Sequence, residues 1–420
     1  ASKVRPLVPQ HAGAPRPGPT SLSEEVFASL GVDNVMARVG DVGEGQSKHL
    51  ALALNAASHA SVHTCQAAIA HALDGGSLQR LFQTNNLQDI AQALNAASKA
   101  DAATCQRAVI LAGETGALRR VFQHGNPQAV AQVLNAASKT DAGTCQRAVA
   151  LAGETGALQR MFQGGNAQDI ANALNAASKA DAATCQQIVT MAADTGALLR
   201  VFRDGTPQAV ANALNAASKA DAATCQQAVT LAGHTGALRR VFENGTPQRT
   251  THALNAASKA DAATCQRAIA LAGITGALER VFQGGTPQDI ILALNATGKT
   301  DPDTRRQVYA TAERTGALRR WIRPSADGPL QVDLHDLTHD GAVGLLDHAL
   351  AHHRRPGQEV TVITGRGAHR QDGLNPMADV ASEACRRHGM RVELAPDNPG
   401  CLIVREQRPA PAVGVEERQG

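Results

Sequence analysis

A 40-residue repeat fills the middle of the chain and constrains its fold more than any other sequence feature. Five consecutive copies begin at residues 91, 131, 171, 211 and 251, share most of the text A-x-A-L-N-A-A-S-K-A-D-A-A-T-C-Q, and never slip in phase. A more divergent copy precedes them and another follows, which makes seven repeats. Repeats of this length stack on their neighbours into solenoids, whose end units must face water. We therefore expect a solenoid over residues 51–323 with atypical end repeats.

The text of each repeat predicts helices. In one copy Pro207 suits the first turn of a helix that we expect to run to Ala220. Asp221 is a good N-cap for a second helix ending near Leu231, and residues 237–242 fit a short third turn. Apolar residues recur at helical spacing, and the chain is poor in the aromatic residues that sandwiches and barrels favour. The fold class expected for this region is an all-α solenoid.

The cysteines of the repeats occupy one repeat position. Stacked helices lie about 8–10 Å apart, beyond the roughly 7 Å that a disulfide spans between Cα atoms. One thiol per repeat also does not supply converging ligands for a metal ion. We expect buried, reduced thiols and a reducing intracellular compartment, cytoplasmic by default, with delivery into a host cell or an organelle as other readings. The six residues are Cys65, Cys105, Cys145, Cys185, Cys225 and Cys265.

Charge and hydropathy limit the classes of binding partner that the sequence predicts. The net charge of +3 does not by itself indicate a polyanionic partner, so any basic surface must be local. No apolar run approaches the roughly 20 residues of a membrane span, and no signal-peptide pattern opens the sequence. We expect a soluble monomer without a membrane partner. Residues 1–20 and 407–420 are predicted to be disordered, and residues 21–50 to form a degenerate N-terminal cap.

Three positions of the first helix are predicted to share one outward face. At about 100° per residue, positions 2, 5 and 9 of a repeat lie within about 60° of one another. Position 5 is Asn in every repeat. Position 2 varies, and in the five inner repeats it is Gln92, Gln132, Asn172, Asn212 and His252. Position 9 supplies a row of lysines, namely Lys99, Lys139, Lys179, Lys219, Lys259 and Lys299.

Such a face suits single-stranded RNA. Regularly spaced lysines can neutralise successive phosphates, and amide or imidazole side chains at position 2 can read one base edge per repeat. Residues 91–290 carry 17 Lys and Arg against 13 Asp and Glu, so the charge argument is modest. Two alternatives stay open: a solvated face whose Asn row only bonds neighbouring helices, and an Asn ladder that holds a peptide backbone.

The start of the repeat resembles a known RNA-binding repeat. Residues 207–219 read P-Q-A-V-A-N-A-L-N-A-A-S-K, which is similar to P-Q-x-L-A-x-x-L-W-A-x-A-K in the first helix of octotricopeptide repeats. Asn215 stands where Trp is common. The resemblance covers about a third of each repeat. It implies sequence-specific RNA binding, often on organellar transcripts, as for the pentatricopeptide repeats.

The C-terminal part changes pattern. The repeat phase ends after Trp321, and residues 324–329 read as a linker. Strands are predicted at 330–334, 359–364, 391–394 and 401–404, with helices at 339–353 and 376–388. This order predicts a small α/β sandwich over residues 330–406. We expect the His-His-Arg-Arg run at 352–355 to be a solvated helix end rather than a metal site.

Two motifs in this part resemble signatures of the small MutS-related (Smr) domain. Residues 332–337 read V-D-L-H-D-L, against φ-D-L-H-G-L in the family, and residues 364–369 read T-G-R-G-A-H, against T-G-x-G-x-H. Many Smr domains act as endonucleases on RNA or DNA. The resemblance maps the family's site onto Asp333, His335, Gly365, Arg366, Gly367 and His369. Asp336 replaces the usual Gly, so it either distorts the turn or adds a carboxylate to the site.

The residues themselves fit phosphodiester cleavage. Asp333 and His335 would point the same way on a strand, and a carboxylate beside an imidazole can orient a general base. The 365–367 segment offers free amides and a cation for a phosphate, and His369 could act as the acid. Asp333 and Asp336 could instead hold a divalent cation, Mg²⁺ or Mn²⁺.

Together these features predict an RNA-binding repeat protein that delivers an Smr-type endonuclease to single-stranded RNA. The alternatives are a non-catalytic RNA-binding regulator, a DNA-nicking endonuclease and a peptide-binding scaffold.

Overall fold

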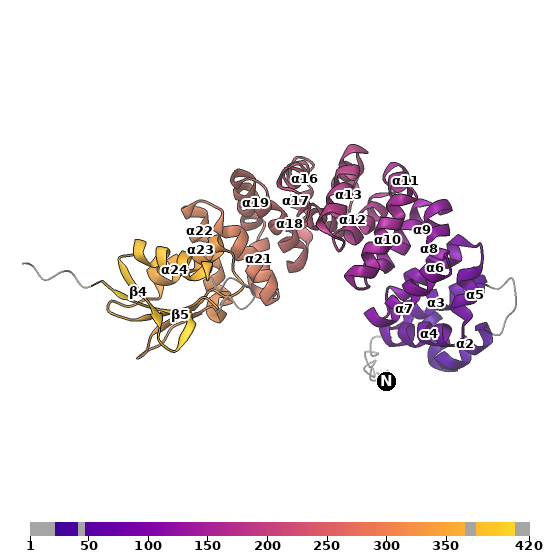
Figure 1. Ribbon diagram of the computed structural model, residues 1–420, viewed down its shortest axis with the longest axis horizontal. Helices are drawn as coiled ribbons and strands as arrows, with labels where there is room; N and C mark the ends of the chain where they lie inside the picture. The colour runs from indigo at the N-terminus through magenta and orange to yellow at the C-terminus, as the bar shows by residue number, and fades with distance from the viewer. Residues whose placement is uncertain (1–21, 41–46, 366–374, 408–420) are drawn as a thin grey trace, which may run out of the picture. The chain divides into compact units, whose positions relative to one another are not determined.

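The computed structural model describes residues 22–40, 47–365 and 375–407, and Figure 1 traces its elements. The chain divides into two compact units, residues 1–161 and 162–420, and each is described by itself. None of the helices in the described residues combines the length and the apolar character that crossing a membrane would require.

The first unit contains the N-terminal helices and the first repeats. Helices α1 and α2 pack on α3 and α4, as expected of a cap for the first repeat. The bounds are α1 Leu22–Leu30, α2 Val32–Gly40, α3 Ser47–Ala60, α4 Val62–Asp74, α5 Ser77–Gln83, α6 Leu87–Ala97, α7 Ala102–Glu114, α8 Ala117–His124, α9 Pro127–Ala137, α10 Ala142–Glu154 and α11 Ala157–Gly164.

The second unit contains the remaining repeats and the C-terminal domain, and in the seventh repeat a 3₁₀ turn takes the place of the third α-helix. The repeat helices are α12 Ala167–Ala177, α13 Ala182–Asp194, α14 Ala197–Asp204, α15 Pro207–Ala217, α16 Ala222–His234, α17 Ala237–Asn244, α18 Pro247–Lys259, α19 Ala262–Ile274, α20 Ala277–Gly284, α21 Pro287–Gly298 and α22 Pro302–Arg314, followed by the 3₁₀ turn η1 Ala317–Arg320. Within each unit the first helices of successive repeats stack on one another. The predicted α-solenoid is confirmed.

Local signals set the helix ends. The Asp221 side chain accepts a hydrogen bond from the backbone N–H of Thr224, so the predicted N-cap of α16 is confirmed. Helix α15 ends at Ala217, three residues before the predicted end, because residues 218–220 form a turn. The predicted third turn is a complete helix, α17, and it follows Gly236, whose φ of +73° favours glycine.

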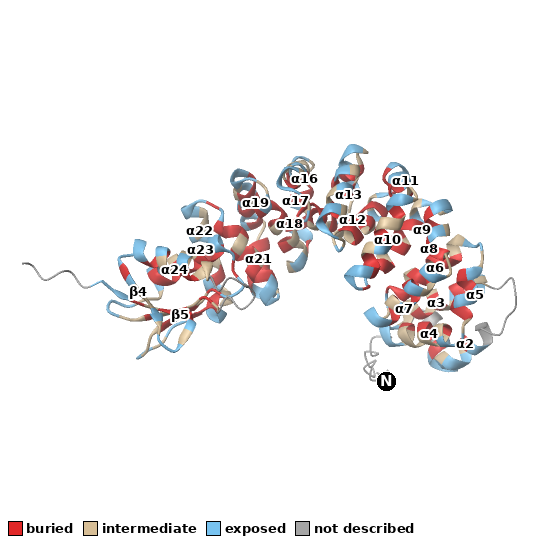
Figure 2. Cartoon of the chain, in the orientation of Figure 1, coloured by how far each residue is buried: buried red, intermediate tan, exposed pale blue. Residues whose placement is uncertain are grey.

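Within each unit many residues of the repeat helices are buried, and Figure 2 colours them red. Phe242 and Cys225 are fully buried, and the Cys225 thiol donates to the backbone oxygen of Ala256 in the next repeat at 3.3 Å. Burial raises the pKa of Cys225 to about 11. Arg240 donates to the backbone oxygen of Phe202 in the preceding repeat, a contact that the sequence interpretation missed. None of the eight cysteines, all within the described residues, forms a disulfide.

The C-terminal domain is a five-stranded mixed sheet with two helices, in the order β1-β2-β3-β5-β4. Strands β2 and β3 are parallel, and the other neighbouring pairs are antiparallel. Helices α23 and α24 pack together, and α24 packs on β4 and β5. The bounds are β1 Ile322–Arg323, β2 Leu330–Asp333, α23 His339–His352, β3 Val360–Ile363, α24 Pro376–Arg387, β4 Met390–Ala395 and β5 Asn398–Glu406.

The predicted linker at 324–329 connects two strands of this sheet. Strand β1 pairs with β2, so the sheet begins before the linker, inside the range assigned to the solenoid. The single tryptophan, Trp321, is buried at this junction, and its backbone oxygen accepts from the N–H of Asp333 at 2.7 Å. The sequence missed β1 because a two-residue strand carries no periodic signal.

The seventh repeat does not face water, contrary to the expectation from its divergence. Helix α23 packs on α21 and α22. Tyr309 is buried and its hydroxyl donates to the backbone oxygen of Gly341 at 3.1 Å. A Cβ on Gly298 would lie 2.4 Å from the backbone carbon of Asp340, so only glycine allows this approach. The divergence of the last repeat therefore serves the docking of the C-terminal domain.

Candidate functional site

The first Smr-like motif forms a turn at the carboxyl end of β2. Asp333 is the last residue of the strand, and His335 lies in the turn that follows. The prediction that both side chains point the same way from a strand is therefore wrong in its geometry. The Asp333 carboxylate accepts from the backbone N–H of His335 at 3.0 Å, which shapes the turn.

Asp336 supplies the carboxylate beside the imidazole. Its φ of +68° makes it the one non-glycine residue with positive φ in the described part of the chain. Asp tolerates this left-handed conformation better than most residues, so the turn forms with Asp at this position. Its Oδ1 lies 3.3 Å from Nε2 of His335, and both side chains are exposed. Of the two consequences expected for Asp336, the structure therefore has the added carboxylate.

The second motif begins at the adjacent strand end. The backbone N–H of Leu334 donates to the backbone oxygen of Ile363, which holds the two carboxyl ends together. Gly365 follows with φ +78°, and Asn375 donates to its backbone oxygen at 2.8 Å. The rest of the predicted phosphate loop and the predicted acid, namely Arg366, Gly367 and His369, lie outside the described residues.

A group of three close metal-ligating side chains lies elsewhere than at Asp333 and Asp336. Within residues 22–40, 47–365 and 375–407, the three ligand atoms that lie within 4.8 Å of one another come from Glu313, His348 and His353. Asp333 and Asp336 are not part of such a group in that part of the chain.

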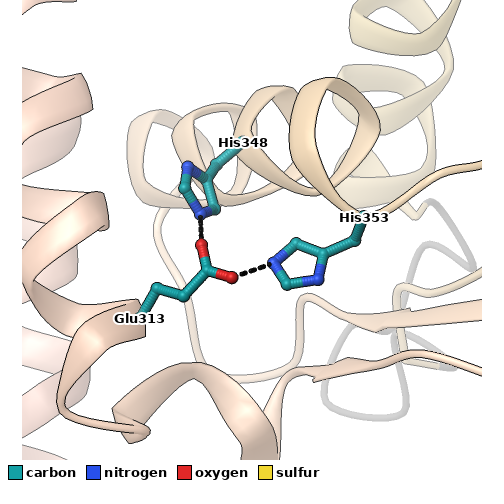
Figure 3. Close-up of side chains that lie close together, drawn as sticks. All are labelled: Glu313, His348 and His353. Carbon is teal, nitrogen blue, oxygen red and sulfur yellow. Dashed lines mark hydrogen bonds and ion pairs between the residues drawn. The ribbon is translucent and has the colours of Figure 1, made fainter.

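Figure 3 shows this other cluster, in which a carboxylate lies between two imidazoles. Glu313 Oε2 is 2.7 Å from Nε2 of His348, and its Oε1 is 3.0 Å from Nε2 of His353. Burial lowers the pKa of His348 in spite of the carboxylate. For Glu313, burial raises the pKa, but the hydrogen bond from His348 and the nearby His353 outweigh burial and lower it. The sequence interpretation, which placed His353 in a solvated helix end, is wrong here.

The Asn row at position 5 bonds neighbouring repeats. Asn215 donates to the hydroxyl of Ser178 at 3.3 Å, and Asn255 donates to Ser218 at 3.3 Å. Asn135 makes the same bond to Ser98 in the first unit. All seven Asn residues are half-buried. These three residues therefore join neighbouring repeats, as the first of the two alternatives expected.

The lysines at position 9 are exposed, but most do not lie on the first helix. Lys219 stands in the turn after α15, whereas Lys259 is the last residue of α18. Lys259 donates to the backbone oxygen of Ser218 at 2.8 Å, and Lys299 donates to that of Ser258. Burial and the neighbouring charges of Lys219 and Lys299 lower the pKa of Lys259. The predicted row of adjacent cations is therefore present in the second unit.

The position-2 side chains are less exposed than predicted. Asn212 is buried, while Gln92, Gln132, Asn172 and His252 are half-buried. Nδ1 of His252 and Oε1 of Gln132 are buried without a hydrogen-bond partner among the described residues. Burial lowers the pKa of His252.

Two further polar side chains join this face. Gln208 donates to Asn212 at 2.8 Å and accepts from Arg249 of the next repeat at 2.6 Å. Neither Gln208 nor Arg249 was among the predicted residues. The sequence could have indicated them only by their spacing, since each precedes position 2 by about one helical turn and so lies on the same helix face.

One end of the face formed by positions 2, 5 and 9 contacts the segment that follows the turn of His335 and Asp336. Asn295, the position-5 residue of the seventh repeat, accepts from the backbone N–H of Thr338 at 2.8 Å and from its hydroxyl at 3.1 Å. Thr338 is the N-cap of α23 and follows the turn that carries His335 and Asp336. The candidate reading face and the candidate catalytic pair are thus adjacent within the second unit.

Comparison with known proteins does not assign the chain to a family. No family model matches the sequence, and no curated protein matches it. A crystal structure of an engineered protein matches 88% of this chain and 87% of its own at 12% identity, with a TM-score of 0.42. A designed armadillo repeat protein matches 57% of this chain and 98% of its own at 16% identity, with a TM-score of 0.33. Neither description names an activity.

Proposed function

We propose that the chain binds single-stranded RNA along its repeats and cleaves it with an Smr-type endonuclease site in the C-terminal domain. The observation that carries this proposal is the contact between Asn295 and Thr338. Thr338, which Asn295 contacts, follows the turn of His335 and Asp336, and we infer from this that the reading face ends beside that turn. A strand that follows the lysines towards the seventh repeat is thereby led to the catalytic pair.

The chemistry is assigned to the exposed pair in the turn. His335 acts as the general base towards water or an RNA 2′-hydroxyl, and the Asp336 carboxylate at 3.3 Å orients its imidazole. Asp333 shapes the turn through the N–H of His335. The amide of Gly365, at the adjacent strand end, would bind a phosphate together with Arg366, Gly367 and the acid His369, which follow in sequence. Mg²⁺ or Mn²⁺ is a candidate cofactor for this turn.

The test for catalysis compares two histidine variants. His335→Ala is expected to reduce cleavage of mixed single-stranded RNA by about 10²–10⁴-fold and to leave the binding affinity unchanged. His388→Gln is the matched control, since His388 pairs with Asp347 away from the turn and its loss leaves cleavage intact. Each assay is run with Mg²⁺, with Mn²⁺ and with a chelator.

Full cleavage by His335→Ala would refute the catalytic assignment. Binding without cleavage by the wild-type protein would favour the non-catalytic regulator, and nicking of DNA in place of RNA would favour the DNA alternative.

The test for binding concerns the lysines of the second unit. Replacing Lys219, Lys259 and Lys299 by Gln is expected to reduce the slope of log K against log salt by about 2, because each phosphate contact on a single strand contributes about 0.7. The matched control replaces Arg203, Arg239 and Arg306 by Gln, because these arginines are also exposed but lie on second or third helices. An unchanged slope in the lysine variant would show that position 9 does not contact the backbone.

Base reading is tested at the one imidazole of the row. His252→Asn gives its repeat the residue present at position 2 in the preceding repeat. We expect a changed sequence preference with an unchanged salt slope, measured by selection of bound RNA from a random pool. An unchanged preference would exclude position 2 as the reader.

A further inference from the structure

Three metal-ligating side chains converge where the seventh repeat meets the C-terminal domain (Figure 3). Glu313 belongs to α22 and His348 to α23, and His353 is the C-cap residue of α23. One ligand atom of each lies within 4.8 Å of the other two. His348 is buried and His353 is nearly so, while the Glu313 side chain is 41% exposed.

The repeat pattern does not explain Glu313. The equivalent position in the other six repeats holds small or apolar residues, namely Leu73, Gly113, Gly153, Ala193, Gly233 and Gly273. The carboxylate is therefore specific to the repeat that contacts α23. Buried polar groups need polar partners. With Gly or Leu at position 313 the two histidines would have no carboxylate beside them, so Glu313, His348 and His353 form one polar group.

The cluster is incomplete as a hydrogen-bonded network. Nε2 of His353 is paired with the Glu313 carboxylate at 3.0 Å, but this buried nitrogen has no hydrogen-bond partner among the described residues. A buried nitrogen of this kind costs free energy unless another group satisfies it. A cation between the two imidazoles would satisfy it and the carboxylate together.

We propose that Glu313, His348 and His353 bind a Zn²⁺-class cation. Two imidazoles and one carboxylate are a donor set typical of Zn²⁺ and of neighbouring transition metals. Bonds of about 2.0–2.1 Å in tetrahedral geometry set the ligand atoms about 3.3 Å apart. The observed separations of 2.7 and 3.0 Å run to different oxygens of Glu313, and the three ligand atoms lie within 4.8 Å of one another, so binding requires the carboxylate and the imidazoles to shift.

The adjustment is within reach because Glu313 is half-exposed and can rotate. The fourth position of the cation would open on the exposed side of Glu313, where water can reach it. The bound ion would link α22 to α23 and so hold the C-terminal domain on the seventh repeat. This site is separate from the turn of His335 and Asp336, so it stands whether or not the chain cleaves RNA.

The test uses the full chain without an affinity tag, freed of metal by a chelator and then dialysed. Zn²⁺ titrated in a calorimeter is expected to bind with a stoichiometry of one and to raise the unfolding temperature. Co²⁺ is expected to give the visible absorption of a low-symmetry site without a thiolate charge-transfer band, because the buried cysteines are not ligands.

Two variants and one control decide the assignment. Changes outside the ligand set of a zinc site cost about 10–100-fold in affinity, so Glu313→Gln and His353→Gln are each expected to weaken Zn²⁺ binding by at least that factor. His388→Gln should bind Zn²⁺ as the wild-type protein does. Tryptophan fluorescence of the apo variants checks that the junction is folded.

Two results would overturn the proposal: absence of saturable one-to-one Zn²⁺ binding by the wild-type chain, or equal Zn²⁺ affinity in both variants and the wild-type. The second result would place the binding at other histidines.

Discussion

Restoring the repeat consensus at residue 298 should weaken the junction between the solenoid and the sheet. The other six repeats have Ser at this position, whereas the seventh has Gly298. A Cβ there would lie 2.4 Å from the carbon and 2.5 Å from the oxygen of Asp340, and 2.6 Å from the nitrogen of Gly341. All three are backbone atoms, so α23 must retreat by about 1 Å. Overpacking of this kind costs about 1–3 kcal/mol.

The net effect of Gly298→Ser is smaller than the clash alone. Ser is a better helix former than Gly by a few tenths of a kcal/mol, which offsets part of the loss. We expect a net destabilisation of the junction of about 1–2 kcal/mol. With a urea slope of about 2 kcal/mol per M, the midpoint of the junction's transition falls by about 0.5–1 M.

The single tryptophan makes this change measurable at the right place. Trp321 is buried beside β1, so its fluorescence reports on the junction, whereas far-UV circular dichroism reports mainly on the repeats. Gly298→Ser should lower the fluorescence midpoint more than the dichroism midpoint. Gly284→Ala is the matched control, because a Cβ at Gly284 meets nothing within 4 Å. Equal fluorescence midpoints for Gly298→Ser and the wild-type would refute the reasoning.

Two further predictions concern the repeats. Asp101 caps α7 by accepting from the N–H of Thr104 at 2.7 Å, so Asp101→Ala should cost about 1 kcal/mol in chemical denaturation while Asp101→Asn, which also caps, should cost far less. Burial raises the pKa of Cys225 and of Cys265 from 9.0 to about 11, so the folded state keeps protons that the unfolded chain releases above pH 9. Their contribution to stability is present below pH 9 and is lost between pH 9 and 11. Urea midpoints across this range should fall less steeply for the Cys225→Ala, Cys265→Ala double variant, and parallel profiles would contradict the burial argument.

The sequence predicted what depends on local rules. The N-cap role of Asp221, the burial of Cys225 and the helical architecture all follow from the spacing of residues within one repeat. The end of α15 was misplaced because the turn at 218–220 is fixed by contacts between repeats, as when Asn255 bonds Ser218. A single repeat cannot report the neighbour on which it stacks.

The candidate site was predicted in composition but not in geometry. The motif indicated Asp333 and His335 as partners, whereas the imidazole faces Asp336. The cause is the positive φ of Asp336, a conformation rare enough outside glycine that a sequence pattern does not favour it. The Glu313 cluster was missed because its members come from two domains and the histidines lie 35 and 40 residues after Glu313 along the chain.

The seventh repeat explains why the two parts of the second unit belong together. Helix α23 contacts α21 and α22 in the way that α21 contacts α18 and α19, so it covers the surface on which a further repeat would stack. Thr338 caps α23 as Thr286 caps α21. The loop before each first helix is where one repeat passes to the next, and the turn of His335 and Asp336 occupies that place before α23. Because α23 takes the position that the first helix of a further repeat would have, the turn before α23 lies beside the face formed by positions 2, 5 and 9. The changes at 298, 309 and 313 are what such a surface needs in order to receive α23 instead of another repeat.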